Sequence, residues 1–233
     1  MKIAIDCGHT ESTAGKRSPD SSLLEYEFNR DVGRQLEAHL KRNGFDTLLI
    51  APTGKDSLTA RCKKANDWKA DLFISIHANA YSNGWHDANG WGIFICGKGG
   101  KAEQLAESIR KVSIPMLGIR DRGVKVEQFT VIAKTNMPAV LVEHAFYTNR
   151  AECELLKTPA FREKCAEADA RGIVEYCKKK WIPEPKDELE EACEKLYRAG
   201  IINSPDYWAK GKGYSDGNVV SLIKKVSQLC KED

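Results

Sequence analysis

The chain has 233 residues, of which 42% are hydrophobic and 30% are charged, and its formal net charge at pH 7 is +3. A chain of this length and globular composition forms one domain of ordinary size, or one domain with a small appendage. The small net charge, with lysine and arginine spread along the chain rather than gathered in one stripe, argues against a nucleic-acid partner.

The first 180 residues alternate strand-like and helix-like segments, as in α/β proteins. We expect a mostly parallel, mixed and twisted sheet with helices on both faces. The helix at 25–42 has apolar residues four apart on one face, and Gly44 follows its end. The expected strands are 3–6, 47–50, 72–77, 92–96, 129–133 and 139–142, and the other expected helices are 58–68, 102–112 and 161–179.

A second, smaller domain follows a proline-containing linker. Pro183 and Pro185 lie within the linker 181–186, where they stop a helix and stiffen the connection. The sequence therefore predicts a main domain over 1–180 and a small all-helical domain over 187–233. The two helical patterns of the second domain span 189–199 and 219–229. A unit this small is near the lower limit of independent stability, so we expect it to dock or self-associate.

Cysteine usage and the start of the chain bear on the compartment. Eight cysteines are present without a CxxC pair, so we expect free thiols in a reducing environment. The chain leads straight into a strand-like run without a signal-peptide pattern, and no apolar stretch approaches the roughly 18 residues of a membrane span. These features predict synthesis in the cytoplasm without membrane insertion, wherever the protein acts later.

Two histidines lie at the ends of apolar strand-like runs. His9 follows the run at 3–6, and His77 ends the run that begins at residue 72. In parallel α/β sheets, active sites lie outside the carboxyl ends of the strands. A longer-than-typical loop follows each histidine, and such loops are often functional. The two imidazoles are therefore expected to converge on a metal ion.

Two glutamates are placed to complete such a site. A catalytic zinc takes three protein ligands and leaves one position for water. Glu25 begins a helix after the loop that leaves His9, although from position alone it could equally complement the helix dipole. Glu143 ends the apolar run 139–142, where an unpaired carboxylate is costly to bury. A base at that place could take a proton from metal-activated water.

Four separate blocks, in this order, carry a resemblance to a known family. They are Asp6-Cys7-Gly8-His9, Glu25, Ala70-Asp71-Leu72-Phe73-Ile74-Ser75-Ile76-His77-Ala78-Asn79 and Met137-Pro138-Ala139-Val140-Leu141-Val142-Glu143. Together they resemble the zinc-dependent N-acetylmuramoyl-L-alanine amidases of the family-3 type, over about residues 1–178. Arg61, Asn66 and Asn149 also fall where that family has an arginine and asparagines.

The resemblance implies a site and a reaction. His9, Glu25 and His77 would bind Zn²⁺, and Glu143 would be the catalytic acid/base. The substrate would be the amide that joins N-acetylmuramic acid to L-alanine in bacterial peptidoglycan. An endolysin or autolysin of this kind, made in the cytoplasm without a signal peptide, would reach the wall after release through a membrane lesion or by cell lysis.

Several residues keep two interpretations. Asn79 and His86 are candidates for substrate binding, with a solvated loop histidine as the alternative for His86. Cys7 stands where the family usually has proline, and its thiol would either reach the metal or be a small core residue. His144 would point away from Glu143 along a strand, toward core packing or a supporting hydrogen bond.

Two other functions remain as alternatives. One is a catalytically inactive wall-binding protein on the same fold, against which the complete set of three ligands and Glu143 argues. The other is a zinc hydrolase of a different amide or peptide. The C-terminal segment resembles the small helical repeats appended to phage lysins. Its aromatic residues would either stack on wall sugars or form the core of the unit, and they are Tyr197, Tyr207, Trp208 and Tyr214.

Overall fold

The computed structural model describes residues 1–54, 56–185, 188–202, 204–209 and 217–229. The chain divides into two compact units, Met1–Ile182 and Pro183–Asp233. Across the described residues, none of the helices combines the length and apolar character that a membrane span requires. The seven described cysteines are free thiols, and Cys230 lies outside the described residues.

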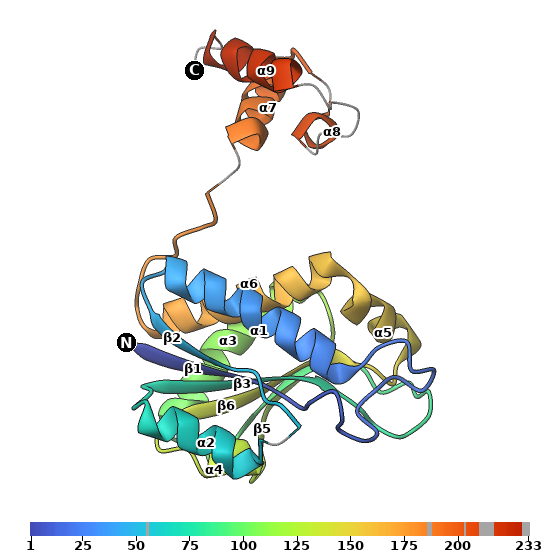
Figure 1. The fold of residues 1–233 in the computed structure, drawn as a ribbon, viewed down its shortest axis with the longest axis vertical. Coiled ribbons are helices and arrows are strands. Elements are labelled where there is room, and N and C mark those ends of the chain that lie inside the picture. Colours follow the sequence, from blue (N-terminus) through green and yellow to red (C-terminus); the bar gives the residue numbers. More distant parts are fainter. Residues whose placement is uncertain (55, 186–187, 203, 210–216, 230–233) are drawn as a thin grey trace. The chain divides into compact units, whose positions relative to one another are not determined.

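The first unit is built on one six-stranded sheet with the order β2-β1-β3-β6-β4-β5 (Figure 1). The pairs β1–β2, β1–β3 and β3–β6 are parallel, β4 runs antiparallel to β6, and β4 and β5 are parallel to each other. This confirms the expected mixed, mostly parallel α/β sheet. The strands are β1 (Lys2–Cys7), β2 (Asp46–Ile50), β3 (Leu72–Asn79), β4 (Trp91–Ile95), β5 (Asp121–Val126) and β6 (Ala139–Phe146).

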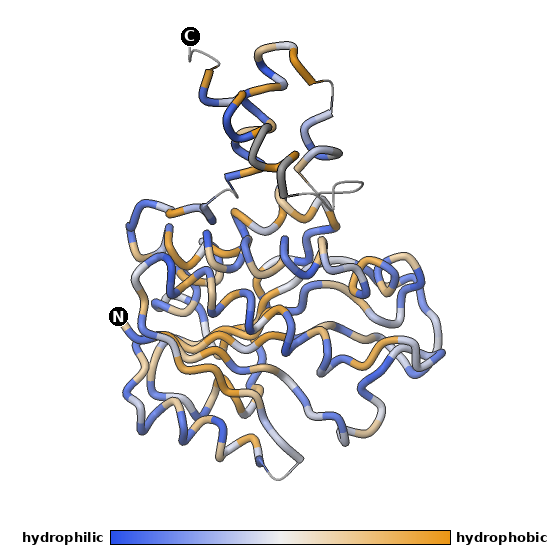
Figure 2. Tube along the Cα trace, turned by 45° about the horizontal axis from the view of Figure 1, so that its top comes forward, coloured by the Kyte–Doolittle hydropathy of each residue, from blue (hydrophilic) through white to orange (hydrophobic). Residues whose placement is uncertain are grey.

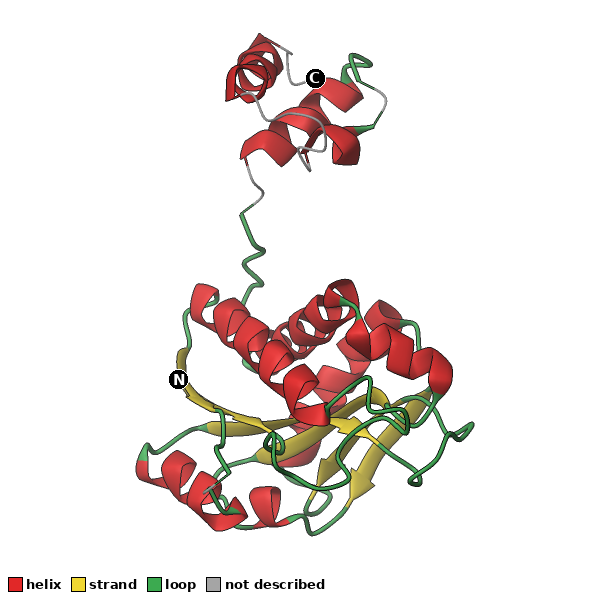
Figure 3. Cartoon of the chain, turned by 45° about the vertical axis from the view of Figure 1, so that its right-hand side comes forward, coloured by secondary structure: helices red, strands yellow, loops and turns green. Residues whose placement is uncertain are grey.

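Helices cover the two faces of this sheet unequally (Figures 1 and 3). Three long helices, α1 (Glu25–Arg42), α3 (Lys101–Leu117) and α6 (Pro159–Tyr176), lie on one face, and α6 packs against both others. The other face carries α2 (Leu58–Asp67) and the single turn α4 (Thr130–Ala133). The helix α5 (Arg150–Lys157) packs against α6 and β6.

Alternation of side chains along the strands creates two separate cores. On β3, Ile74 and Ile76 belong to the core under the three long helices, whereas Phe73 belongs to the core under α2 and α4. On β1, Ile5 and Ala4 divide in the same way. Figure 2 shows the apolar strands running through the middle of this unit. The strands therefore read as continuous apolar runs, because both of their faces are covered.

The structure differs from the expected elements of this unit in several places. Residues 129–133, expected as a strand, form the helical turn α4, because a short apolar run does not distinguish strand from helix. Its Val131 carbonyl accepts a hydrogen bond from Cys62 Sγ of α2 at 3.6 Å, which ties the turn to that helix. The edge strand β5 was not expected, because its sequence Asp-Arg-Gly-Val-Lys-Val lacks a clear apolar face. The helix expected at 102–112 continues through Pro115 to Leu117.

The second unit contains three described helices, α7 (Glu188–Arg198), α8 (Pro205–Ala209) and α9 (Gly217–Leu229). Its described core contains Ala192, Cys193, Leu196 and Ile223, and Trp208 packs against it. Tyr197 is 52% exposed. Tyr214 and the side chain of Tyr207 lie outside the described residues. Of the aromatic residues singled out in this segment, Trp208 therefore has a core role and Tyr197 is open to solvent.

Candidate metal centre

The sheet places His77 and Glu143 side by side. The two residues are register partners on the neighbouring parallel strands β3 and β6, near the carboxyl ends of both. Each lies an even number of residues after a member of the core under α2 and α4, Phe73 and Leu141. Because side chains alternate along a strand, His77 and Glu143 share that face of the sheet. Their neighbour His144 points to the opposite face.

Glu25 reaches this edge from the first position of α1. Its backbone N–H donates to the carbonyl of Lys16 at 2.9 Å, and an isolated bridge joins Arg17 to Leu24, so the base of the loop is closed. The carboxylate is buried, and its Oε1 lies 3.0 Å from Nδ1 of His77. The same oxygen accepts a bond from the N–H of Ala78 at 3.3 Å. This contact network holds Glu25 in one orientation.

His9 enters the site through an unusual backbone. Its φ is 61°, in the left-handed region that few non-glycine residues occupy. The preceding Gly8 lies so close to the ring of His77 that a Cβ at this position would overlap it. Glycine is therefore required at position 8 for the two imidazoles to approach. The rings of His9 and His77 meet edge to face, with centroids 4.8 Å apart.

One possible ligand atom from each of His9, Glu25 and His77 lies within 4.8 Å of the others. Among the described residues, this is the only group of three or more histidine, cysteine, aspartate or glutamate side chains that could hold a metal ion. Nε2 of His9 is 3.4 Å from Oε2 of Glu25. Oε2 of Glu25 and Nε2 of His77 are buried without a hydrogen-bond partner. A buried polar atom without a partner is costly, and a bound cation would satisfy both atoms. Two imidazoles and one carboxylate match the ligand set of a catalytic zinc.

The protonation states suit metal binding. Burial lowers the pKa of His9 to about 4, although the nearby carboxylate of Glu25 acts to raise it, so the ring is neutral near pH 7. Burial acts to raise the pKa of Glu25, but the hydrogen bond with His77 holds it below its usual value. A neutral imidazole and an ionised carboxylate are the forms that bind metals.

Glu143 is separate from this group. Burial raises the pKa of its carboxyl well above the usual value, and the negative charge of Glu25 raises it further, whereas Lys16 and Lys125 oppose the shift. Its Oε2 is buried without a hydrogen-bond partner. A carboxyl group with a raised pKa can both take and return a proton near neutral pH.

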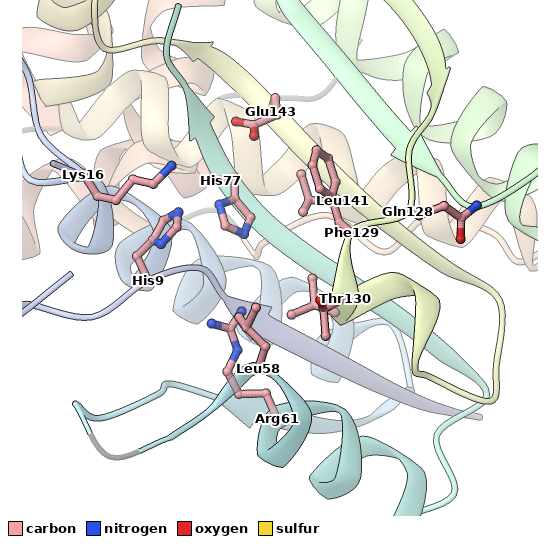
Figure 4. A pocket seen from close by; sticks show the side chains of 11 residues that line it. His9, Lys16, Leu58, Arg61, His77, Gln128, Phe129, Thr130, Leu141 and Glu143 are labelled. Atoms are coloured by element: carbon pink, nitrogen blue, oxygen red, sulfur yellow. The ribbon is translucent and has the colours of Figure 1, made fainter. Parts of the chain in front are cut away.

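His9, His77 and Glu143 face a cleft of about 370 Å³ on the α2 and α4 side of the sheet. In Figure 4, Lys16 extends toward the two histidines from one side, and Phe129 and Gln128 lie on the other side of His77. The rest of the lining comes from α2, α4 and β6. The lining residues are His9, Lys16, Leu58, Arg61, His77, Gln128, Phe129, Thr130, Val131, Leu141 and Glu143.

Buried polar contacts support the candidate ligands from both faces of the sheet. Under the cleft, Asp6 accepts bonds from Arg61 Nε at 2.8 Å and from Ser75 Oγ at 2.7 Å, and it pairs with Nη2 of Arg61. On the opposite face, the ring of His144 lies 3.2 Å from the carbonyl oxygen of His77 and 2.9 Å from Asp169. Asp169 and Lys16 were not found from the sequence, because neither belongs to a motif block.

The structure separates the other candidates from this centre. Cys7 is buried on the opposite face, where its Sγ is the nearest neighbour of Gly33 on α1, and burial raises the pKa of its thiol to about 12. Cys7 is thus a core residue. Asn79 ends β3 and does not line the cleft. His86 stacks on Tyr81, with ring centroids 4.0 Å apart, and lines a different pocket.

Asn66 and Asn149, the two asparagines of the motif pattern, make hydrogen bonds that hold neighbouring elements together. Asn66 joins the end of α2 to the turn before β6, because it donates to the carbonyl of Lys134 and accepts from the N–H of Asn136. Asn149 is the N-cap of α5, where its Oδ1 accepts from the N–H of Glu152 at 3.1 Å. Both side chains hold elements around the site rather than lining it.

Comparison with known proteins agrees with this geometry. A protein-family model described as N-acetylmuramoyl-L-alanine amidase matches residues 3–175. The amidase LytC of Bacillus subtilis (strain 168) is 36% identical over 177 residues, which cover 75% of this chain and 35% of LytC. An endolysin of Bacillus phage SPP1 is 36% identical over 217 residues, covering 88% of this chain and 77% of that protein.

Solved structures show the same fold. The catalytic domain of the amidase CwlV from Bacillus (Paenibacillus) polymyxa var. colistinus superposes with a TM-score of 0.71 at 31% identity, covering 77% of this chain and 99% of that one. The amidase AmiC2 of Nostoc punctiforme gives a TM-score of 0.71 at 29% identity, covering 77% and 98%. These matches confirm the resemblance seen in the motif blocks. The chain belongs to the Amidase_3 family of N-acetylmuramoyl-L-alanine amidases.

Proposed function

We propose that this protein is a zinc-dependent lytic enzyme that hydrolyses the amide between N-acetylmuramic acid and L-alanine in bacterial peptidoglycan. The observation that carries the proposal is the group formed by His9, Glu25 and His77 beside the separate carboxyl of Glu143. Family membership supports the amide as the target. The similarity to a phage endolysin supports a lytic role.

His9, Glu25 and His77 are the residues that would hold the zinc ion, since their ligand atoms converge and two of these atoms are buried without partners. Zinc bound there would supply a Lewis acid that polarises the amide carbonyl and makes water more acidic. The contacts of Glu25 with His77 and Ala78 keep the ligands in place before the ion arrives. Such preorganisation lowers the cost of binding.

Glu143 is the proton carrier in this proposal. Its carboxylate takes a proton from the attacking water, whose oxygen forms a bond to the amide carbon. The resulting carboxylic acid then gives this proton to the amide nitrogen as the carbon–nitrogen bond breaks, which releases the L-alanyl amino group. A raised pKa serves both steps, because the acid form is then accessible near neutral pH.

The place of action and the role of the second unit belong to the same proposal. In this proposal the enzyme is made in the cytoplasm and acts on the wall after release through a membrane lesion or by lysis, and the similarity to a phage endolysin supports this route. The helical unit after the linker would direct it to the wall. Self-association of this unit is the competing role, which sedimentation of the whole protein distinguishes from wall binding.

Digestion of purified cell walls tests the proposed reaction. The protein is incubated with walls with and without a chelator, and the new amino termini and reducing sugars are quantified. We expect new L-alanine amino termini, no new reducing sugars, and loss of release with chelator that added zinc restores. Binding to walls without release would identify an inactive wall-binding protein. Cleavage confined to other peptides or amides would identify a different zinc hydrolase.

A further inference from the structure

Lys16 places a positively charged side chain at the cleft. Its side chain lines the cleft with His9, His77 and Glu143, and it is half-buried. The ammonium group makes no hydrogen bond or ion pair with any described residue. The neighbouring cation Arg61 differs, because Asp6 neutralises it beneath the cleft. Lys16 is therefore available to a ligand in the cleft.

The backbone holds Lys16 at this place. Its carbonyl accepts the N–H of the ligand Glu25 at 2.9 Å, and the bridge between Arg17 and Leu24 closes the loop next to it. Lys16 is thus joined to the first turn of α1, although it belongs to a long loop. A cation fixed at one end and free at its tip is suited to bind an anion that arrives with the substrate.

Charge balance points to an anionic group. The carboxyl groups of Glu25 and Glu143 offset at most the two charges of a divalent ion, and Asp6 balances Arg61. With the ion bound, the charge of Lys16 makes the net charge of the cleft positive. Glu25 does not need Lys16 as a partner, because His77 and Ala78 already contact its carboxylate. A partly desolvated ammonium group pairs well with a carboxylate.

The two sides of the cleft differ in chemistry. Lys16 lies on one side of His77, and Phe129 lies on the other with its side chain toward the cleft (Figure 4). Leu58 and Phe129 expose apolar surface, being 48% and 40% exposed. The side of Phe129 suits the apolar face of a sugar, and the side of Lys16 suits an anionic group on the peptide part of the substrate.

Resting on the proposed amidase function, we propose that Lys16 binds a carboxylate of the substrate's stem peptide close to the scissile amide. The carboxyl group of L-alanine is consumed in its bond to the next residue, so the stem residue that follows L-alanine is the first that can offer a free carboxylate. Lys16 is then a specificity-determining residue, which favours muropeptides with a free carboxylate there over those in which it is amidated. The glycan leaves the cleft over Phe129.

Two synthetic N-acetylmuramoyl peptides test this inference with the zinc-loaded, full-length protein. They differ only in the second stem residue, which carries a free carboxylate in one and the corresponding amide in the other. We expect the wild-type kcat/KM to be about tenfold higher for the acid, the effect of one charge-assisted contact. Salt should reduce this preference, because the cation is partly exposed.

Substitutions then assign the preference to Lys16. Lys16→Met should bring the ratio of the two kcat/KM values close to one, mainly by raising KM for the acid. Lys16→Arg should retain the preference, and Lys164→Met, on an exposed part of α6, should leave the ratio unchanged. Equal losses on both substrates in Lys16→Met, or a wild-type preference that is absent or insensitive to salt, would overturn the assignment. If the wild type cleaves neither substrate, the amidase proposal falls with it.

Discussion

The two faces of the sheet in the first unit differ in how completely they are covered. Three long helices seal one face over a core of large apolar residues, which includes Phe28, Leu36 and Trp91. The other face carries one helix of 10 residues and the four-residue turn α4. A cleft remains beside that turn, and the candidate metal centre opens into it. The face with less packing is the one that holds the candidate metal centre.

Because side chains alternate along a strand, one strand contributes both to the packed core and to the candidate site. On β6, Val142 and His144 point to the sealed face, and Leu141 and Glu143 point to the open face. Every second residue of the strand is thus available for stability and the others for the site. We expect substitutions on the sealed face to change the free energy of unfolding, and substitutions on the open face to change activity.

His77→Ala should have the largest effect on the open face. The loss of one of three ligands should remove the metal and reduce wall hydrolysis to that of chelator-treated protein. Metal content per chain, measured by elemental analysis after dialysis, checks this expectation. His39→Gln is the matched control on the sealed face, where His39 pairs with Glu163. That variant should lose stability but keep its metal, and loss of metal in it would break the comparison.

Glu143→Gln should reduce kcat by about 10²–10⁴-fold, because the amide of glutamine cannot carry the proton. The metal should stay bound, since Glu143 does not belong to the ligand group. Turnover of a muropeptide and metal content are measured on the same sample. A parallel loss of metal would show that Glu143 is a ligand instead of the proton carrier.

Gly172→Ala probes the sealed face. A Cβ at this position of α6 would lie 2.5 Å from the Cα of Ile109 on α3, so the two helices would have to separate. We expect a loss of about 1–3 kcal/mol in the free energy of unfolding, measured by urea denaturation, with kcat unchanged. Gly97→Ala is the control, because its Cβ meets no atom within 4 Å. An unchanged midpoint of urea denaturation in Gly172→Ala would contradict the close packing of α6 against α3.

Phe129→Ala should raise KM for muropeptides several-fold with a small change in stability. The ring lines the cleft and is 40% exposed, so its removal costs substrate contact more than core packing. Leu155→Ala, at 39% exposure on α5, is the control with similar burial and should leave KM unchanged. A drop in stability larger than that of Gly172→Ala would mean that the open face is also a core.

His9 lines the cleft, and the effect expected of it, a shifted pKa, is the smallest of those considered. In the metal-free protein its pKa should be about 4 rather than the usual 6.5, because burial disfavours the charged imidazolium. The ring therefore stays neutral as the pH falls from 7 to 5 and gains its proton only near pH 4. An NMR titration of its ring protons checks this. A midpoint near 6.5 would show that water reaches His9 freely.

Much of the fold and of the candidate site was predictable from local patterns. The apolar runs that end in His9, His77 and Glu143 indicated strands whose carboxyl ends meet, and the four motif blocks indicated the family. The strand expected at 129–133 was wrong, because a short apolar run takes the form that its tertiary contacts favour. His86 was separated from the centre because its loop folds toward α5, which no local pattern encodes.

The sequence alone determined the α/β class, most of the strands and helices, the candidate residues of the metal centre and the resemblance to the family, because these depend on composition, periodicity and motif spacing. Only the tertiary structure decided which face of each strand is open, that Cys7 faces α1, and that Lys16 lies in the cleft. These outcomes depend on contacts between residues far apart in the chain, such as Lys16 with Glu25 and Glu25 with His77. Long-range packing, which local propensity does not encode, sets them.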